Sequence, residues 1–223
     1  AIGIGIIGAG KVGTTMGKYF VTHGEEVSGF YSRTVNSAKE AAKFCNTKYF
    51  SELDSLIEVS DTLFITVTDG AIKEVWDCIA GYDLTGKILC HCSGSLSSNV
   101  FSGIEQTGAV GCSIHPMYAF SDRFTSYQNF STAYLVAEGM PAAYEPLAQM
   151  FRELGHTVLY LQAENKVKYH AAAAMVSNDM IALFQTVLDL LEQCGFARED
   201  SVGLLRPLVM GNAVSYTHLT LPT

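Results

Sequence analysis

Apolar residues gather in short runs along most of the chain, and polar segments separate these runs. Residues 2–7, 26–31, 62–67 and 87–92 form such runs, which are typical of buried strands. Between them, segments such as residues 11–22 place apolar side chains three and four positions apart, as an amphipathic helix does. Strand and helix therefore alternate. This pattern predicts an α/β fold with a doubly wound, mostly parallel sheet and helices on both faces.

The pattern changes near residue 162. Before it, the same signals predict strands at 110–114, 133–137 and 157–161 and helices at 37–44, 71–79 and 142–154. Beyond it, only helical spacing remains, with a long helix to about Cys194 and a second helical segment over 202–210. We therefore predict two domains, an α/β domain over residues 1–162 and a smaller all-α domain over residues 163–214.

Both ends of the sequence suggest a clipped chain. Ala1 already belongs to the first predicted strand, and no initiator methionine precedes it. The last residues, SYTHLTLPT at 215–223, continue neither the helical period nor any helix cap signal. We expect them to be a non-native tail, so that the helical domain is truncated.

Composition and charge narrow the class of protein. Hydrophobic residues make up 48% of the 223 residues and charged residues 16%, which indicates a folded chain. The net charge of -8 and the lack of a basic cluster give no support to a nucleic-acid or anionic membrane partner. The opening AIGIGIIGAG lacks a basic n-region and runs into a glycine motif, which argues against a secretory signal, and no apolar run approaches the roughly 20 residues that span a bilayer. We expect a soluble, cytoplasmic protein.

The six cysteines do not form a recognisable metal or redox motif. No two of them have CxxC spacing, and a chain without a secretory signal favours reduced, mostly buried thiols. Cys90, Cys92, Cys112 and His115 could be imagined as ligands of one ion, but their spacing fits no common zinc pattern. The sequence therefore predicts no metal site.

The sequence GAGKVG follows the first predicted strand and opens the first predicted helix. This is the context in which a GxGxxG motif indicates a dinucleotide-binding loop. Gly8 permits a tight turn, Gly10 lets the backbone approach a pyrophosphate, and Gly13 lets helix and strand pack closely. The free N–H groups of the helix N-terminus favour the phosphates. The predicted cofactor-binding residues of this loop are Gly8, Ala9, Gly10, Lys11, Val12 and Gly13.

The second predicted strand ends in YSRT, without the carboxylate that an NAD site uses to hold the ribose 2'-hydroxyl. Ser32, Arg33 and Thr34 can instead donate hydrogen bonds to a 2'-phosphate, with Arg33 as its counter-charge. The sequence therefore predicts NADP as the cofactor. The alternative is that Arg33 is an ordinary solvated arginine and the choice of cofactor is weak.

Three later strands end in polar residues. Thr68 and Asp69 follow residues 62–67, Ser93 follows His91 in HCSGSL, and His115 occurs in SIHPM. Ligands of open α/β sheets bind at the carboxyl ends of the strands. We therefore predict that Thr68 and Asp69 lie near the cofactor and that the two histidines emerge where a nicotinamide would meet its substrate.

Several motifs, in order, resemble a known family. They are GxGxxG with YSRT, VTDGAI, HCSGSLSSNVF, GCSIHPMYAF, KYHAAAAMVSN and RPLVMGN. The chain resembles, from Ile2 to about Asn212, the NADP oxidoreductases that pair a Rossmann-like domain with a helical C-terminal domain of unknown function. These proteins are similar more broadly to pyrroline-5-carboxylate reductases and beta-hydroxyacid dehydrogenases.

This resemblance implies NADP binding at the glycine loop, a cleft between two domains and a homodimer formed through the helical domain. It implies no particular substrate. In the related dehydrogenases, a lysine on the first long interdomain helix takes part in acid/base chemistry, with an asparagine nearby. Lys166 or His170 could accordingly protonate a substrate, and Ser93, His115 or Asn178 could orient it. The alternative is that Lys166 is a solvated lysine and His170 a packing residue.

We therefore predict an NADP(H)-dependent oxidoreductase that transfers hydride to or from a small carbonyl, imine or hydroxyacid. A non-catalytic NADP-binding sensor or interaction protein is the alternative, because such a protein would need the same glycine loop and Arg33 but no proton donor. A deazaflavin-linked exchange of hydride would need a second cofactor site that the sequence does not reveal.

Overall fold

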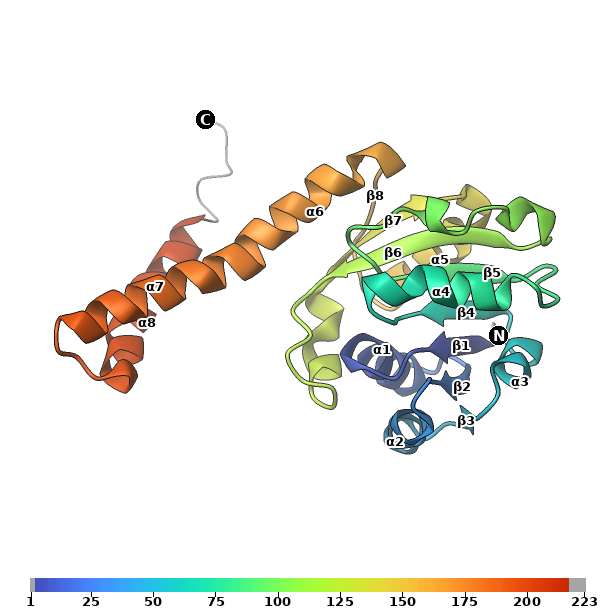
Figure 1. Ribbon diagram of the computed structural model, residues 1–223, viewed down its shortest axis with the longest axis horizontal. Helices are drawn as coiled ribbons and strands as arrows, with labels where there is room; N and C mark the ends of the chain where they lie inside the picture. Colours follow the sequence, from blue (N-terminus) through green and yellow to red (C-terminus); the bar gives the residue numbers. More distant parts are fainter. Residues whose placement is uncertain (1–2, 217–223) are drawn as a thin grey trace. The chain divides into compact units, whose positions relative to one another are not determined.

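A computed structural model describes residues 3–216, and the chain divides into two compact units after His170. The first unit contains the whole sheet and the first turns of the long helix that follows it (Figure 1). The boundary predicted at residue 162 falls inside this unit. The division of the chain into two functional domains at residue 162 stays a prediction.

The sheet of the first unit has eight strands in the order β3-β2-β1-β4-β5-β6-β7-β8. All neighbouring strands are parallel except β6 and β7, which are antiparallel. The chain reverses its direction of growth between β1 and β4, which is the switch point where such sheets bind ligands. The doubly wound, mostly parallel sheet is thus confirmed. Its strands are β1 (Ile4–Ile7), β2 (Val27–Tyr31), β3 (Tyr49–Phe50), β4 (Thr62–Ile65), β5 (Ile88–His91), β6 (Val110–Met117), β7 (Tyr134–Gly139) and β8 (Val158–Tyr160).

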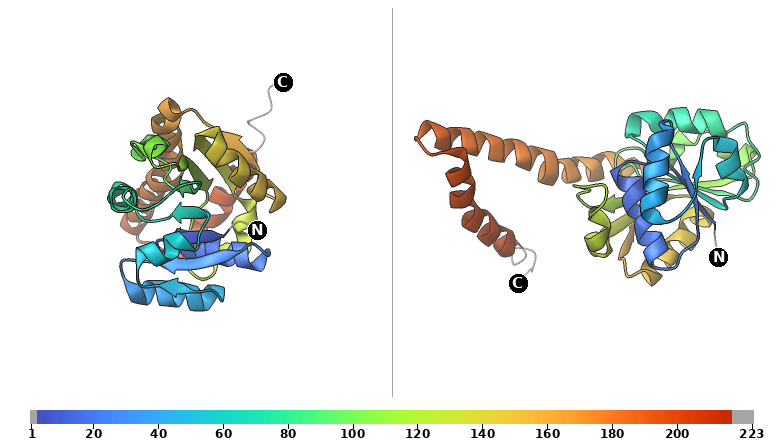
Figure 2. Two further views of the ribbon diagram at one scale, coloured as in Figure 1. Left: turned by 90° about the vertical axis from the view of Figure 1, so that its right-hand side faces the viewer. Right: turned by 90° about the horizontal axis from the view of Figure 1, so that it is seen from below.

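Helices cover both faces of this sheet, as the two further views make clear (Figure 2). Side chains of α1 (Lys11–Thr22), α2 (Val35–Cys45) and α5 (Pro141–Glu153) share one apolar cluster with one face. Side chains of α3 (Leu53–Glu58) and α4 (Asp69–Ile79) share a second cluster with the opposite face. The short 3₁₀ segments are η1 (Ser98–Val100), η2 (Ile104–Gln106), η3 (Ser126–Thr132) and η4 (Ala163–Asn165).

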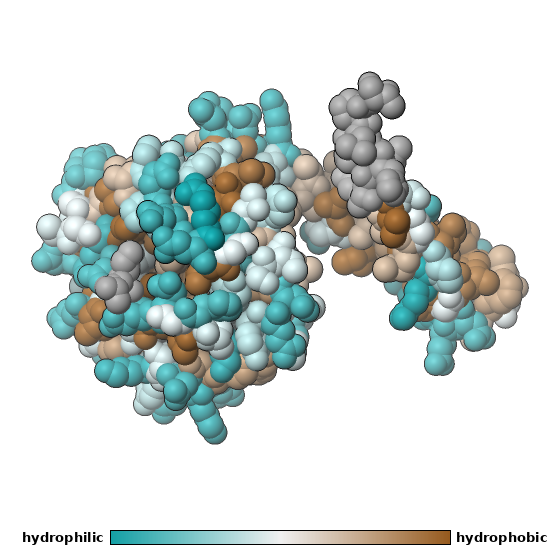
Figure 3. Space-filling view, turned by 180° about the vertical axis from the view of Figure 1, so that it is seen from behind, coloured by the Kyte–Doolittle hydropathy of each residue, from teal (hydrophilic) through white to brown (hydrophobic). Residues whose placement is uncertain are grey.

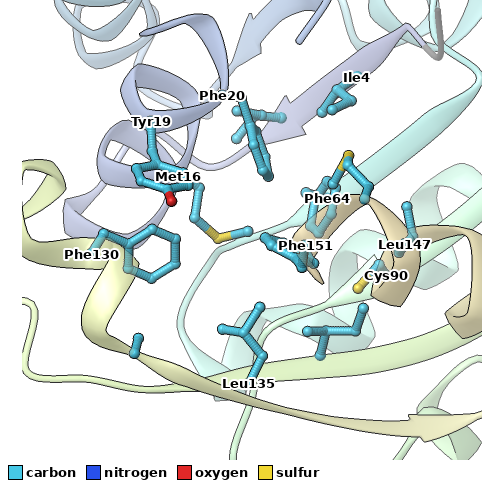
Figure 4. Packing of buried hydrophobic residues seen from close by; sticks show 14 of the residues in the cluster. Ile4, Met16, Tyr19, Phe20, Phe64, Cys90, Phe130, Leu135, Leu147 and Phe151 are labelled. Carbon is cyan, nitrogen blue, oxygen red and sulfur yellow. The ribbon is translucent and has the colours of Figure 1, made fainter. Parts of the chain in front are cut away.

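The core follows from the alternation of side chains along each strand. In β4, Phe64 joins the first cluster while Leu63 and Ile65 join the second. Figure 4 shows Phe20 of α1, Phe64 and Phe151 of α5 gathered in the first cluster. The Phe20 ring centroid lies 5.5 Å from that of Phe64 and 5.6 Å from that of Phe151. Each fully buried phenylalanine contributes about 1.5–3 kcal/mol to folding, so this cluster fixes the position of α1 and its N-terminal loop.

Two elements were not predicted, β3 and α3. The strand has two residues and the helix six, so neither is long enough to display a period in the sequence. Tyr49 and Phe50 pair with β2 at the edge of the sheet, and this pairing rather than a local pattern makes them a strand.

The chain beyond β8 is helical, as predicted. It comprises α6 (Lys166–Ala174), the π-helical segment η5 (Met175–Asp179), α7 (Met180–Gln193) and α8 (Arg198–Tyr216). Within the second unit, α7 and α8 contact each other. Of the predicted tail, Ser215 and Tyr216 are the last residues of α8, and residues 217–223 lie outside the described residues.

The second unit has an apolar surface (Figure 3). Across the described residues 3–216, every buried hydrophobic residue lies at or before Val158. By contrast, the exposed large hydrophobic residues of η5, α7 and α8 include Met175, Val176, Met180, Ile181, Leu183, Leu190, Val202, Leu204, Leu208 and Met210.

One helix, Ala163–Gln193, is long and apolar enough by length and composition to cross a membrane. This corrects the expectation that no segment approaches that length. Polar residues interrupt the apolar runs of this helix, but its mean hydropathy over a long stretch is that of an apolar segment. The same length and composition occur in helices of soluble proteins that are buried in a core, so the finding does not by itself indicate a membrane.

Candidate active site

The glycine loop has the geometry that a pyrophosphate requires. Gly8 has a φ of 110°, in the left-handed region that favours glycine. A Cβ on Gly13 would lie 2.1 Å from the carbonyl oxygen of Gly8 and 2.5 Å from Oγ1 of Thr66, so α1 packs directly on the strand ends. A Cβ on Gly10 would meet no atom within 4 Å. The loop is therefore closed on its inner side and open at Gly10, where the α1 N-terminus presents its free N–H groups.

Thr66, which the sequence analysis missed, holds this loop in place. It is buried, and its hydroxyl donates to the carbonyl oxygen of Gly8 at 2.9 Å. The other predicted loop residues differ in exposure: Ala9 is buried, Val12 is half-buried and Lys11 is exposed. A threonine directly after a buried strand was the available signal.

The end of β2 carries the residues predicted to hold a 2'-phosphate. Arg33 and Thr34 are exposed, and the Ser32 hydroxyl accepts a hydrogen bond from the Thr34 amide at 3.3 Å. A second arginine contacts α2 from the segment after β6. Arg123 pairs with Glu40 at 2.7 Å and donates to the carbonyl oxygen of Ser37 at 2.7 Å, so it ties the segment after β6 to α2.

Thr68 and Asp69 begin α4 and are exposed. The Ser95 hydroxyl donates to the Asp69 carboxylate at 2.6 Å. This contact links the loop after β4 to the turn after β5, at the carboxyl edge where both were predicted.

The turn after β5 is organised by Ser93 and His91. The Ser93 hydroxyl accepts hydrogen bonds from the amides of Ser95 at 3.1 Å and Leu96 at 2.9 Å, so it stabilises the turn. His91 is fully buried, accepts from the Ser93 amide through Nδ1 at 3.1 Å and donates through Nε2 to the Ser97 carbonyl oxygen at 3.0 Å. Burial lowers the pKa of His91 to about 4. His91 is therefore a neutral structural residue.

Lys166 is buried against this turn. Lys166 is only 2% exposed, and its Nζ donates a hydrogen bond to the backbone carbonyl oxygen of Ser93 at 2.7 Å. Burial lowers the pKa of Lys166, while the nearby Glu138 carboxylate raises it. Burial is thus the main cause of the lowered pKa of Lys166. A lysine with a lowered pKa gives up a proton more readily at neutral pH.

His115 packs against the next residue of the same turn, Gly94. A Cβ on Gly94 would lie 2.9 Å from Nε2 of His115, so the imidazole rests directly on the glycine. Burial, followed by the charge of Lys166, lowers the pKa of His115 to about 4. The structure thus brings Ser93, His115 and Lys166 together around two consecutive peptide units.

The remaining predicted residues are placed differently. His170 is exposed, and the helix turns Tyr169 toward His115 instead. The Tyr169 hydroxyl lies 2.6 Å from Nδ1 of His115. Asn178 belongs to η5 in the second unit and is exposed. The signal for Tyr169 was its i,i+3 spacing from Lys166, which places both on one side of a helix.

Glu138 is a second residue that sequence reasoning missed. This carboxylate on β7 is 2% exposed and accepts hydrogen bonds from the Ser98 amide at 2.8 Å, the Ser98 hydroxyl at 2.7 Å and the Ser113 hydroxyl at 2.9 Å. A glutamate in the otherwise apolar strand YLVAEG was the available signal. Glu138 supplies negative charge near Lys166. Among the described residues, no group of three or more side chains could hold a metal ion.

Solved structures share this fold over nearly the whole chain. A candidate NADP oxidoreductase from Bacteroides fragilis is 23% identical, with a TM-score of 0.76 over 98% of this chain and 82% of that one. An imine reductase from a Pseudomonas species is 16% identical, with a TM-score of 0.74 over 98% and 75%. A reductive aminase from Aspergillus terreus, in complex with NADPH and ethyl-5-oxohexanoate, is 18% identical, with a TM-score of 0.73 over 98% and 75%. At these identities the likeness establishes the fold.

Two family profiles match successive parts of the sequence. No curated protein sequence matches the chain. Residues 133–222 match a domain of unknown function, DUF2520, so the C-terminal domain of unknown function that the resemblance implied is present, and the match includes β7, α5 and β8 as well as the helices that follow. Residues 1–116, just over half of the chain, match the Rossmann-like domain. This protein therefore belongs to the Rossmann-like domain family and combines that domain with a DUF2520 domain.

Proposed function

We propose that this protein is an NADP(H)-dependent oxidoreductase that transfers hydride to or from a small carbonyl, imine or hydroxyacid. The observation that supports this most is the buried Lys166, whose ammonium group contacts the Ser93 carbonyl oxygen at the carboxyl edge of a dinucleotide-binding sheet. A sensor of NADP would need the glycine loop but not a buried proton donor. The presence of NADPH in a structural neighbour further supports the choice of cofactor.

The residues of the first unit fit this cofactor. The loop is open at Gly10, and the α1 N-terminus adds N–H groups and a positive dipole end that suit a pyrophosphate. Ser32, Arg33 and Thr34 are accessible for a 2'-phosphate, with two hydroxyls and one guanidinium group. NADPH, when bound, supplies the hydride.

Lys166 provides the proton that balances the hydride. As the substrate carbon gains hydride, the oxygen of a carbonyl or the nitrogen of an imine gains electron density, and Lys166 donates a proton to that atom. The products are an alcohol or an amine, oxidised cofactor and neutral lysine. The Ser93 carbonyl oxygen fixes the direction of the ammonium group, and water then restores its proton.

The test is oxidation of NADPH in the presence of a panel of ketoacids, aldehydes, ketones and cyclic imines. We expect Lys166→Met to lower kcat by about 100-fold or more while NADPH binding is retained. Lys168→Met is the matched control, because Lys168 is an exposed lysine on the same helix. If no substrate class is reduced, or if Lys166→Met is fully active, the enzyme hypothesis is wrong and the sensor is favoured.

Arg33 tests the choice of NADP over NAD. Removal of its guanidinium group should lower NADPH affinity by about tenfold and leave NADH affinity unchanged, because only NADPH carries the 2'-phosphate. Fluorescence titration of the wild type and Arg33→Ala with both cofactors measures this. Equal affinity of the wild type for NADH and NADPH would contradict the proposal.

We also propose that the protein forms a homodimer through the helical unit and acts in the cytoplasm. The apolar residues of α7, such as Leu183 at 62% exposure, need a partner, while Gln185, Asp189 and Glu192 make the opposite side of the same helix polar. A helix with one apolar and one charged side suits a second copy better than a lipid bilayer. Light scattering should give a dimer for the wild type and a monomer for Leu183→Asp. Gln185→Glu, which adds charge on the polar side, should remain dimeric.

A further inference from the structure

Tyr169 and His115 form a contact that the proposed proton transfer does not use. The two residues come from α6 and β6, and both belong to the first unit. The Tyr169 hydroxyl lies 2.6 Å from Nδ1 of His115, with the two rings nearly perpendicular at 84°. A partly buried contact this close between two polar groups fixes the orientation of the imidazole.

The geometry indicates which atom donates. A separation of 2.6 Å suits an O–H donor, whereas N–H···O hydrogen bonds cluster near 2.9–3.0 Å. Burial also raises the pKa of Tyr169 to about 12, so the hydroxyl keeps its proton at neutral pH. Among the described residues, the hydroxyl has no other hydrogen-bond partner. Tyr169 therefore donates its proton to Nδ1, and the proton of a neutral His115 must be on Nε2.

Nε2 of His115 is available for a ligand. Within residues 3–216 the structure gives this nitrogen no hydrogen-bond partner, and the ring rests on Gly94. The adjacent Ser93 carbonyl oxygen receives the ammonium group of Lys166. The Ser93–Gly94 dipeptide thus contacts two donor residues, His115 with its Nε2–H group and Lys166 with its ammonium group. Such a pair suits a substrate atom with free lone pairs, as in a carbonyl group, a carboxylate or a neutral imine, and disfavours a preformed iminium cation.

We propose that Tyr169 is a positioning residue that holds His115 as the neutral tautomer protonated at Nε2, so that His115 donates a hydrogen bond to the substrate and Lys166 alone supplies the proton. This role in substrate binding rests on the proposed function. The tautomer itself does not depend on it, because Tyr169 and His115 are in contact without any ligand.

The first experiment measures the tautomer directly. Protein labelled with ¹⁵N in its histidine rings is studied by long-range ¹H–¹⁵N correlation spectra between pH 6 and 8, with His115→Gln used to assign the signals. We expect wild-type His115 to be neutral and protonated at Nε2, and Tyr169→Phe to give a mixture of tautomers. Protonation at Nδ1, an imidazolium at pH 6, or an unchanged tautomer in Tyr169→Phe would overturn the proposal.

The second experiment tests the donor role with a substrate from the panel described above. A glutamine at position 115 keeps an N–H donor but has no pKa near neutrality, so His115→Gln should stay within about tenfold of wild-type kcat/KM. His115→Leu should lose a further tenfold or more. Tyr169→Phe should raise KM by about tenfold and change kcat less than about threefold. Tyr160→Phe is the control, because its exposed hydroxyl contacts Glu145 instead.

The two proposals can fail separately. If no substrate is reduced but His115 is protonated at Nε2 only when Tyr169 is present, the proposed function is wrong and the positioning role of Tyr169 stands. If activity is found and His115→Gln is as inactive as His115→Leu, His115 is itself a proton donor and the division of roles is overturned.

Discussion

The two ends of the candidate site are built in different ways. At the glycine loop, six consecutive residues and Thr66 form the whole structure, and the close contacts join the loop backbone to itself and to the Thr66 hydroxyl. At the turn after β5, side chains from β5, β6 and α6 converge on the Ser93–Gly94 segment, and Glu138 of β7 holds Ser98 a few residues further on. The first end depends on glycines at fixed spacing, whereas the second depends on buried polar groups that must find one another across the fold.

This difference determines how each end should respond to change. Backbone atoms in close contact cannot move apart to make room. An added methyl group at the loop should therefore disturb folding where it points toward the strands and ligand binding where it points outward. A buried polar group can keep its place while its charge or its hydrogen bonds change, so substitutions at the turn should appear in the pH dependence and in the free energy of unfolding.

The largest effect is expected at Gly13. A Cβ there would lie 2.1 Å from the Gly8 carbonyl oxygen, so Gly13→Ala should lower the free energy of unfolding by at least about 3 kcal/mol and abolish NADPH binding. Gly10→Ala is the matched variant, since its Cβ meets nothing within 4 Å. It should unfold nearly as the wild type does but bind NADPH at least about tenfold more weakly.

Thermal unfolding and NADPH titration of the two variants decide this. Wild-type affinity in Gly10→Ala would mean that no pyrophosphate approaches the loop. An unaltered melting temperature in Gly13→Ala would mean that helix and strand are not in close contact there.

His91 should give the turn a dependence on pH. Below about pH 6.5 the unfolded histidine takes up a proton that the folded, buried imidazole with its pKa of about 4 does not. The free energy of unfolding should therefore fall as the pH falls from about 6.5 to about 4, by roughly 3 kcal/mol for this histidine. Denaturant titrations at several pH values should show that the free energy of unfolding of His91→Gln falls less over this pH range than that of the wild type. Identical pH dependence in both proteins would refute a neutral, buried His91.

Glu138 should have a smaller effect on stability. In Glu138→Gln a neutral amide replaces the carboxylate, so the hydrogen bonds from the Ser98 N–H group and the Ser113 hydroxyl lose their charged acceptor. We expect a loss of about 1–3 kcal/mol in the free energy of unfolding. The pKa of Lys166 should also fall further, because the carboxylate that raises it is gone.

Urea denaturation measures the stability of Glu138→Gln, and the pH dependence of turnover reports on Lys166. Glu153→Gln, an exposed change at the end of α5, is the control. If the two variants are equally stable, the buried hydrogen bonds of Glu138 contribute nothing to the turn.

The smallest effect is expected at Ser95. Its hydroxyl donates to the exposed Asp69 carboxylate at 2.6 Å, and such contacts exchange readily with water. Ser95→Ala should cost no more than about 1 kcal/mol in urea denaturation. A much larger loss would show that the link between α4 and the turn is as important as the buried contacts.

The glycine loop could be predicted because its chemistry is local. The spacing of Gly8, Gly10 and Gly13 after an apolar run contains almost all the information that the loop needs, and α1 was expected at residues 11–22 and is observed there. The alternation of strands and helices likewise follows from periods that are visible in the sequence. The short elements β3 and α3 have no such period and depend on pairing with neighbours.

The turn after β5 could be predicted only in part. Ser93, His115 and Lys166 were identified from strand ends and a polar helix start, but their mutual contacts were not. Helical spacing alone allowed either His170 or Tyr169 to face the sheet. In the folded structure it is Tyr169 that packs against the sheet, where it contacts His115. Glu138 was missed because a buried carboxylate is recognisable only through its distant donors on Ser98 and Ser113.

The contact of Lys166 with a main-chain oxygen has a consequence for genetics. No side-chain replacement at position 93 removes the Ser93 carbonyl group, so the partner of Lys166 is invisible to an alanine scan. In a library of single mutants, substitutions of Lys166 should therefore lower activity, while no substitution of its hydrogen-bond partner Ser93 should have the same effect through loss of this contact. Second-site suppressors of a Lys166 variant should then arise around the turn, at residues that shift its backbone, rather than at any one complementary charge.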